Sequence, residues 1–110
     1  MAHIKERTVE QYLKDSVEAA GGLCIKVKAS GVKGVPDRIV VLEGVTMFVE
    51  LKSKSGKLSI HQRKLFRKIQ AAGGLVFVLD NKDGVDDFMV FCLQNLAEEP
   101  LIWTPGPVDS

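Results

Sequence analysis

The chain has 110 residues, of which 45% are hydrophobic and 26% charged, and its formal net charge at pH 7 is +1. This length provides one domain with a hydrophobic core and is too short for two. The composition is typical of a soluble globular protein.

No apolar run approaches the roughly 20 residues that a membrane-spanning helix needs. The charged N-terminus also lacks the apolar segment of a signal peptide. Two cysteines, Cys24 and Cys92, are far apart and have no metal-binding spacing, so we expect free thiols in a reducing compartment. These features predict a cytoplasmic protein (of the host cell, if the source is viral) without membrane contacts.

Charge is distributed unevenly along the chain. Residues 24–68 contain eleven Lys and Arg but only three acids, a net charge of +8, whereas residues 69–110 carry −6. A basic segment of this kind is typical of a protein that binds a phosphate backbone. The alternative is that the opposite charges balance one another within the fold.

Apolar residues at helical spacing predict a first helix over residues 5–20, ended by the glycines at 21 and 22. Glu6 lies inside the apolar stripe of this helix and Glu10 at its edge. Glutamates seldom face a core without a partner, so both are candidates for a functional site. The helix dipole alone also explains an acid near the helix start, and this explanation suits Glu6 especially well.

Residues 23–28 alternate, which predicts a strand with an apolar face and a polar face that presents Lys26 and Lys28. Both lysines are candidate phosphate contacts, although strand lysines often serve only solubility. The loop that follows, residues 29–35, contains Gly31 and Gly34 and leads into a proline. Its glycines would allow the backbone to approach DNA or a metal closely, or they form a simple turn.

Residues 35–54 predict two strands joined by a tight turn at Glu43-Gly44. Asp37 lies at the start of the first strand, and Glu50 and Lys52 project to one side of the second. Two neighbouring carboxylates repel each other unless a cation separates them, and a hard divalent cation is the usual one. Charged hairpin residues are more often a solvated face. Here, however, the strands are almost entirely apolar, which indicates burial, where an unpaired glutamate is costly.

A second helix is predicted to open at Ser59, with Gln62 at the third helical position as in a capping box. The run Leu-Val-Phe-Val-Leu at 75–79 predicts a buried strand parallel to a neighbour. Asp83 is a candidate cap for a last helix, with a strand over residues 89–93 as the alternative. Residues 98–110 contain three of the four prolines and are expected to form an irregular tail.

The motifs Pro36-Asp37 and Glu50-Leu51-Lys52, together with residues 34–39, the turn at 56–59 and Gln62, resemble the VRR-NUC family (virus-type replication and repair nucleases). This family belongs to the PD-(D/E)xK nuclease superfamily. The resemblance runs from about residue 6 to residue 80. It implies a metal-dependent phosphodiesterase whose small stand-alone relatives are associated with branched DNA, in particular four-way junctions.

The resemblance also implies roles for individual residues. Asp37, Glu50 and the Leu51 backbone carbonyl would hold Mg²⁺ or Mn²⁺, and Lys52 would position a water or stabilise the transition state. A glutamate of the first helix would join the metal site, and we favour Glu10 over its rival Glu6. Gln62 would assist catalysis, which is an alternative to its role as a helix cap. The candidate DNA contacts are Lys26, Lys28, Lys33, Arg38, Lys54 and Lys57.

We therefore expect an α/β protein with a PD-(D/E)xK restriction-endonuclease-like core: a helix, a three-stranded meander, a helix and a strand, followed by a C-terminal helix. Residues 1–97 would form one nuclease domain, with the tail at 98–110. The expected function is a structure-selective DNA endonuclease acting on branched DNA. It would work as a homodimer through the C-terminal apolar residues Phe88, Phe91, Ile102 and Trp103. The alternatives are a nucleic-acid-binding module on a nuclease fold that no longer cuts, and an interaction protein that does not bind nucleic acid.

Overall fold

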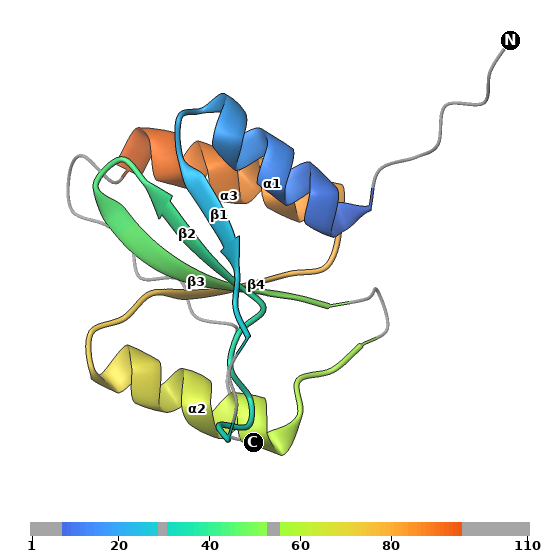
Figure 1. The fold of residues 1–110 in the computed structure, drawn as a ribbon, viewed down its shortest axis with the longest axis vertical. Coiled ribbons are helices and arrows are strands. Elements are labelled where there is room, and N and C mark those ends of the chain that lie inside the picture. The colour runs from blue at the N-terminus through green and yellow to red at the C-terminus, as the bar shows by residue number, and fades with distance from the viewer. Residues whose placement is uncertain (1–7, 29–30, 53–55, 96–110) are drawn as a thin grey trace, which may run out of the picture.

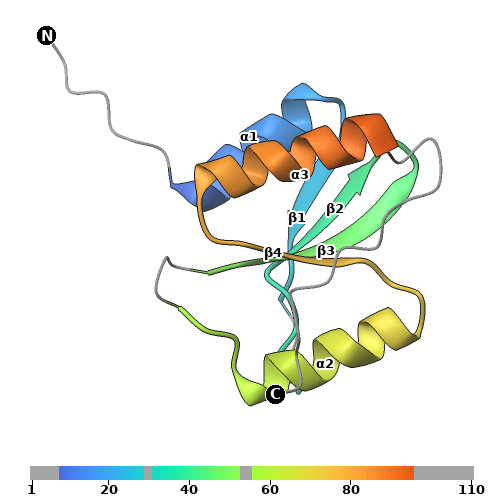
Figure 2. The same ribbon diagram turned by 180° about the vertical axis from the view of Figure 1, so that it is seen from behind.

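A four-stranded sheet lies between two layers of helices in the computed structural model, which describes residues 8–28, 31–52 and 56–95 (Figure 1). Helices α1 and α3 lie side by side over one face of the sheet, and α2 lies on the other face, as the view from behind also shows (Figure 2). The elements in chain order are α1 (Val9–Ala19), β1 (Leu23–Lys26), β2 (Arg38–Leu42), β3 (Val45–Leu51), α2 (Ile60–Ala71), β4 (Val76–Leu79) and α3 (Lys82–Asn95).

The strands follow one another across the sheet in the order β1-β2-β3-β4. The first three pair antiparallel, whereas β4 pairs parallel to β3 after the chain has crossed the sheet through α2. The turn between β2 and β3 has positive φ at both central residues, 54° at Glu43 and 79° at Gly44. Two positive φ values are what a tight hairpin turn matched to the strand twist requires. The expected α/β fold and its hairpin turn are thus confirmed.

The helix starts agree only in part with the expectations. Helix α2 has the full capping box: Gln62 N–H donates to Ser59 Oγ, and Ser59 N–H donates to Gln62 Oε1. Helix α1 begins at Val9, because Thr8 caps it by accepting from the backbone N–H of Gln11. The predicted last helix is confirmed as α3, and residues 89–93 belong to it and do not form the alternative strand. Its cap is Asn81, whose side chain accepts from Gly84 N–H at 2.6 Å, and the predicted cap Asp83 was wrong.

The hydrophobic core lies between the sheet and the pair of helices α1 and α3. Leu13 and Val17 of α1 meet Val40 of β2 and Met47 of β3 there, all fully buried. Phe88, which we expected at a dimer interface, is 3% exposed and stacks edge-to-face on Phe77, so the core absorbs it. On the opposite face of the sheet, helix α2 buries its own residue Phe66.

In strand β1 the buried face is the one that carries Cys24, and not the more apolar face that carries Leu23 and Ile25. Cys24 packs in the core, whereas Leu23 and Ile25 are 58% and 49% exposed. The reason is tertiary: α1 packs on β1 from the Cys24 side, while α2 lies over β4, at the other edge of the sheet.

Several expectations concern residues outside the described ranges: Glu6, Lys54, the tail at 98–110 with Ile102 and Trp103, and the domain boundary at 97. Within those ranges, no helix has the length and apolar character needed to cross a membrane.

Candidate active site

The β2–β3 hairpin brings Asp37 and Glu50 together through reciprocal backbone contacts. Arg38 is the register partner of Val49, so the residues just outside that pair, Asp37 and Glu50, are neighbours across the hairpin. The backbone N–H of Asp37 donates to Glu50 Oε1 at 3.1 Å, and that of Leu51 donates to Asp37 Oδ2 at 3.0 Å. Each carboxylate is thereby held by the strand that carries the other.

Glu50 is a buried acid in a partly neutralised environment. It is 2% exposed, and its Oε2 lies 2.7 Å from Gln62 Nε2 and 3.3 Å from Lys52 Nζ. Burial, and next the negative charge of Asp37, raise the pKa of Glu50, while Lys52 and Gln62 oppose this rise. The carboxylate therefore remains short of positive charge even with its two partners in place.

Gln62 closes the capping box of α2 and also contacts the acidic pair. Its Oε1 accepts from Ser59 N–H at 2.8 Å and closes the capping box, while its Nε2 donates to Glu50. One amide thus joins the start of α2 to the acidic pair, because its two ends face in different directions.

Glu10 does not join Asp37 and Glu50. Its Oε2 accepts from both Nη2 and Nε of Arg38, at 2.7 and 3.2 Å, on the face of the sheet that α1 covers. The acidic pair faces α2, on the other side. These hydrogen bonds from Arg38 lower the pKa of Glu10. The structure thus places the favoured helix glutamate in an ion pair with a neighbouring strand and not beside the carboxylates.

Arg38 also differs from the expected DNA contact, since it is only 8% exposed. Its position in β2 explains this: Arg38, Val40 and Leu42 alternate onto the buried face of the sheet. This alternation was a signal in the sequence that Arg38 points inward and needs an acidic partner. Among the other candidate contacts, Lys26, Lys28, Lys33 and Lys57 are all exposed.

We expect Glu10→Gln to lower the free energy of unfolding by about 1 kcal/mol at pH 7. It leaves the buried Arg38 charge without an anion, and the effect is moderated because the Glu10 side chain is itself 42% exposed. Since the pKa of Glu10 is lowered, its contribution is present above the usual value of 4.5 and lost as the pH falls through the lower folded value. Urea unfolding at pH 7 and pH 3 measures both effects. The control is Glu18→Gln, which removes an exposed pair with Lys14; equal stabilities of the two variants at pH 7 would contradict a role for the Glu10–Arg38 pair.

Comparisons with known proteins decide the family. The chain is 37% identical over 84 residues to the candidate nuclease p44 of Acyrthosiphon pisum secondary endosymbiont phage 1, covering 76% of this chain and 90% of the relative. A solved structure described as a VRR_NUC domain superposes with a TM-score of 0.69 at 36% identity, covering 74% of this chain and 89% of that one. The chain belongs to the VRR-NUC family. No family model matches it. The membership confirms the expected resemblance and identifies the chain as a nuclease.

The donor set of this VRR-NUC chain fits a hard divalent cation. No group of three or more His, Cys, Asp and Glu side chains suited to a metal occurs in the part of the chain that the structure describes. Asp37 and Glu50 form a pair, however. Burial and next the repulsion from Asp37 raise the pKa of Glu50, and a cation between the two acids would relieve that repulsion. Two carboxylates suffice for Mg²⁺, which keeps several waters and takes its remaining ligands from substrate phosphates.

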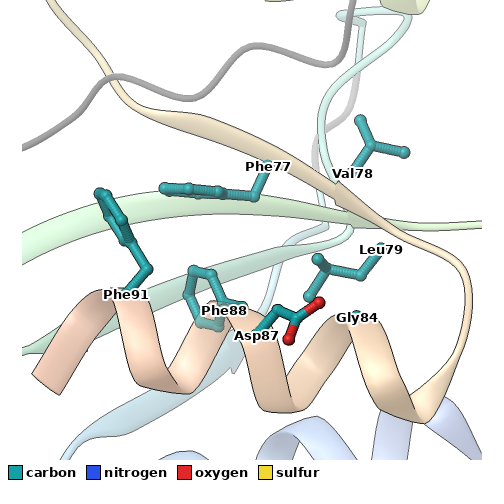
Figure 3. A pocket seen from close by; sticks show the side chains of 7 residues that line it. All are labelled: Phe77, Val78, Leu79, Gly84, Asp87, Phe88 and Phe91. Atoms are coloured by element: carbon teal, nitrogen blue, oxygen red, sulfur yellow. The ribbon is translucent and has the colours of Figure 1, made fainter. Parts of the chain in front are cut away.

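An apolar cavity of about 210 Å³ lies elsewhere in the fold, between β4 and α3 (Figure 3). Phe77, Phe88 and Phe91 line it on one side and Leu79 on the other, with Asp87 as its charged residue. None of the candidate catalytic residues lines this cavity. It therefore belongs to the α3 side of the VRR-NUC fold and not to the acidic pair.

Proposed function

We propose that this VRR-NUC nuclease is a divalent-metal-dependent DNA endonuclease that hydrolyses phosphodiester bonds and prefers branched DNA, four-way junctions in particular. The observation that carries the proposal is the Asp37–Glu50 pair, in which each carboxylate accepts a hydrogen bond from a backbone N–H of the opposite side of the hairpin, while Lys52 and Gln62 both contact Glu50 Oε2. A lysine next to paired acids supplies the mixed charge that phosphodiester hydrolysis needs.

Asp37, Glu50 and the backbone carbonyl of Leu51 would hold Mg²⁺ or Mn²⁺. When bound, such an ion supplies Lewis acidity toward the scissile phosphate and lowers the pKa of a coordinated water. The two backbone N–H groups fix the rotamers of the acids before any ligand arrives, so that little reorganisation is needed on binding.

Lys52 and Gln62, which both contact Glu50 Oε2, would act on the reacting groups. The Lys52 side chain is 22% exposed, so it lies at the border between solvent and the buried acid. From there it would hold the attacking water or stabilise the negative charge that develops on the phosphate. Gln62 would orient Glu50 and offer its amide to a water or a substrate oxygen.

The DNA backbone would contact the basic side chains around this site. The exposed Lys28, Lys33 and Lys57 belong to the loops that follow β1 and β3. Lys26 is the register partner of Arg38, so its side chain points to the α1 face near Glu10 and lies on the other side of the sheet from the acidic pair. Arg38 is left out of this set, since its guanidinium is engaged with Glu10.

Symmetric cleavage of a junction requires two active sites, so we propose a homodimer as the working unit. The observations that favour α3 as the interface are its exposed Val90 and Leu93, at 51% and 53%, and the neighbouring half-buried Phe91. This helix lies on the face of the sheet opposite to the acidic pair, which would leave both sites open to DNA. Light scattering at micromolar concentration tests the dimer, and the mass of a single chain with and without junction DNA would exclude it.

The proposed activity predicts cleavage of labelled DNA only when a divalent ion is present. Single-stranded, duplex, flap and four-way-junction substrates, each incubated with Mg²⁺, Mn²⁺ or EDTA, measure both the ion requirement and the preference. We expect no product in EDTA and the fastest cleavage of the junction. Binding without cleavage under all conditions would favour the non-cutting module, and equal rates on duplex and junction would remove the shape preference.

A further inference from the structure

Gly34, in the loop before the Pro-Asp pair, lies unusually close to the start of α2. A Cβ placed on Gly34 would lie 2.5 Å from both the carbonyl carbon and the carbonyl oxygen of His61, and 2.7 Å from Gln62 N. All three are backbone atoms of the first turn of a capped helix, so they cannot rotate away as a side chain would. The hydrogen of a glycine is the only substituent that this contact accommodates.

One of the backbone atoms next to Gly34 belongs to Gln62, whose side chain donates a hydrogen bond to Glu50. Gln62 holds its place through its backbone N–H, which donates to Ser59 Oγ, and its Nε2 then extends 2.7 Å to Glu50 Oε2. A methyl group on Gly34 would push the loop and the first turn of α2 apart. Because this turn carries Gln62, the displacement would move the Gln62 amide away from Glu50.

We propose that Gly34 is a positioning residue, which sets the reach of the Gln62 amide to Glu50 through close backbone packing on the first turn of α2. The inference rests on the proposed function only for its consequence in catalysis, since the contact itself is independent of any activity. Gly34 acts through Gln62 and touches neither the substrate nor the acids.

The loop supplies a matched control. Gly31 has nearly the same φ, +83° against +87° at Gly34, but a Cβ on Gly31 would meet nothing within 4 Å. Alanine at either position has a positive φ, which is strained for a residue with a Cβ. Only alanine at Gly34 adds the collision with α2, so the difference between the two variants isolates that contact.

The first measurement is the side-chain amide signal of Gln62 in a ¹⁵N-correlated NMR spectrum, assigned by its loss in Gln62→Met. We expect the Gln62 amide protons of Gly34→Ala to move toward the free-amide position and to exchange faster with water, and those of Gly31→Ala to stay at the wild-type position. An unchanged Gln62 signal in folded Gly34→Ala overturns the proposal. This reading needs no cleavage, so a failure of the proposed nuclease function would leave it intact.

The second measurement is a double-mutant cycle on the cleavage rate. We expect Gly34→Ala to reduce kcat by roughly 10²-fold, as a misplaced catalytic geometry commonly does. Gly34→Ala combined with Gln62→Met should lose no more than Gln62→Met alone, whereas multiplicative losses would overturn the proposal. Gly34→Asn, with Gly31→Asn as its control, repeats the test with a side chain that tolerates positive φ. If both Gly34 variants fail to fold while both controls fold, Gly34 serves folding and the positioning role is wrong.

Discussion

Asp37→Asn and Glu50→Gln are expected to reduce the cleavage rate by at least about 10²–10³-fold, the usual effect of removing one transition-state electrostatic partner. Both substitutions keep the size of the side chain, and in Asp37→Asn the amide oxygen can still accept the hydrogen bond from Leu51 N–H. In Glu50→Gln, an amide oxygen at the Oε1 position leaves the amide nitrogen facing two donors, Gln62 Nε2 and Lys52 Nζ. Asp37→Asn therefore isolates the loss of charge, whereas Glu50→Gln also disturbs the hydrogen bonds of the site. Rates on junction DNA in Mn²⁺ measure it, and variants that cut like the wild type would refute the site.

The thermal stability of Glu50→Gln relative to the wild type should depend on pH. Burial and the charge of Asp37 raise the pKa of Glu50, so the folded state favours the neutral form of this acid more than the unfolded state does. The stability associated with that form is present below the usual value of 4.5 and is lost as the pH rises through the raised folded value. Without metal, the melting temperature of Glu50→Gln should therefore rise relative to that of the wild type as the pH increases from 4 to 8.

A divalent ion should raise the melting temperature of the wild type more than that of either variant. At a metal concentration tenfold above Kd, linkage stabilises the folded wild type by about 1.4 kcal/mol, or roughly 6 °C in Tm for a domain of this size. Asp37→Asn and Glu50→Gln should gain little, because each has lost one of the two anionic ligands. Thermal melts with Mn²⁺ and with EDTA at pH 8 measure this directly. An equal rise in all three proteins would place the bound ion elsewhere.

The acidic site was predictable because its determinants are local. The turn at Glu43-Gly44 fixes the register of the hairpin, and the register alone places Asp37 opposite Glu50. Lys52 follows from the two-residue period of β3, and the Ser59–Gln62 box from the spacing at the start of α2. These features depend on residues close together in the sequence, which is why the pattern sufficed.

The features that the sequence did not predict depend on how layers pack. Alternation divides β1 into two faces, but the helix that covers it decides that Cys24 is buried and Ile25 exposed. Likewise, helical periodicity places Glu10 at the edge of the apolar stripe without showing which strand lies beneath it. In the structure Arg38 lies beneath Glu10 and forms an ion pair with it. Glu10 is therefore engaged with Arg38, although the family resemblance had assigned it to the metal.

Lys52→Ala is expected to reduce turnover by about 10²–10³-fold while leaving the fold and the metal response in place. The Lys52 ammonium lies 3.3 Å from Glu50 Oε2, but Glu50 keeps two other donors, Gln62 Nε2 and the backbone N–H of Asp37. The acid is therefore still hydrogen-bonded without the lysine. We expect the rise in Tm with Mn²⁺ to match that of the wild type, which separates Lys52 from the metal ligands Asp37 and Glu50.

Lys57→Ala is the matched control, because it removes the same charge from an exposed position beyond the same strand. Its effect should be on DNA affinity, which salt screens, and saturating DNA should restore most of the rate. Lys52→Ala should stay slow at saturating DNA, since its loss affects the chemical step and not binding. Single-turnover rates at two DNA concentrations distinguish the two cases. If excess DNA rescues Lys52→Ala as well, or if its Tm falls and its folded fraction cuts normally, Lys52 binds or supports the structure and has no part in the hydrolysis itself.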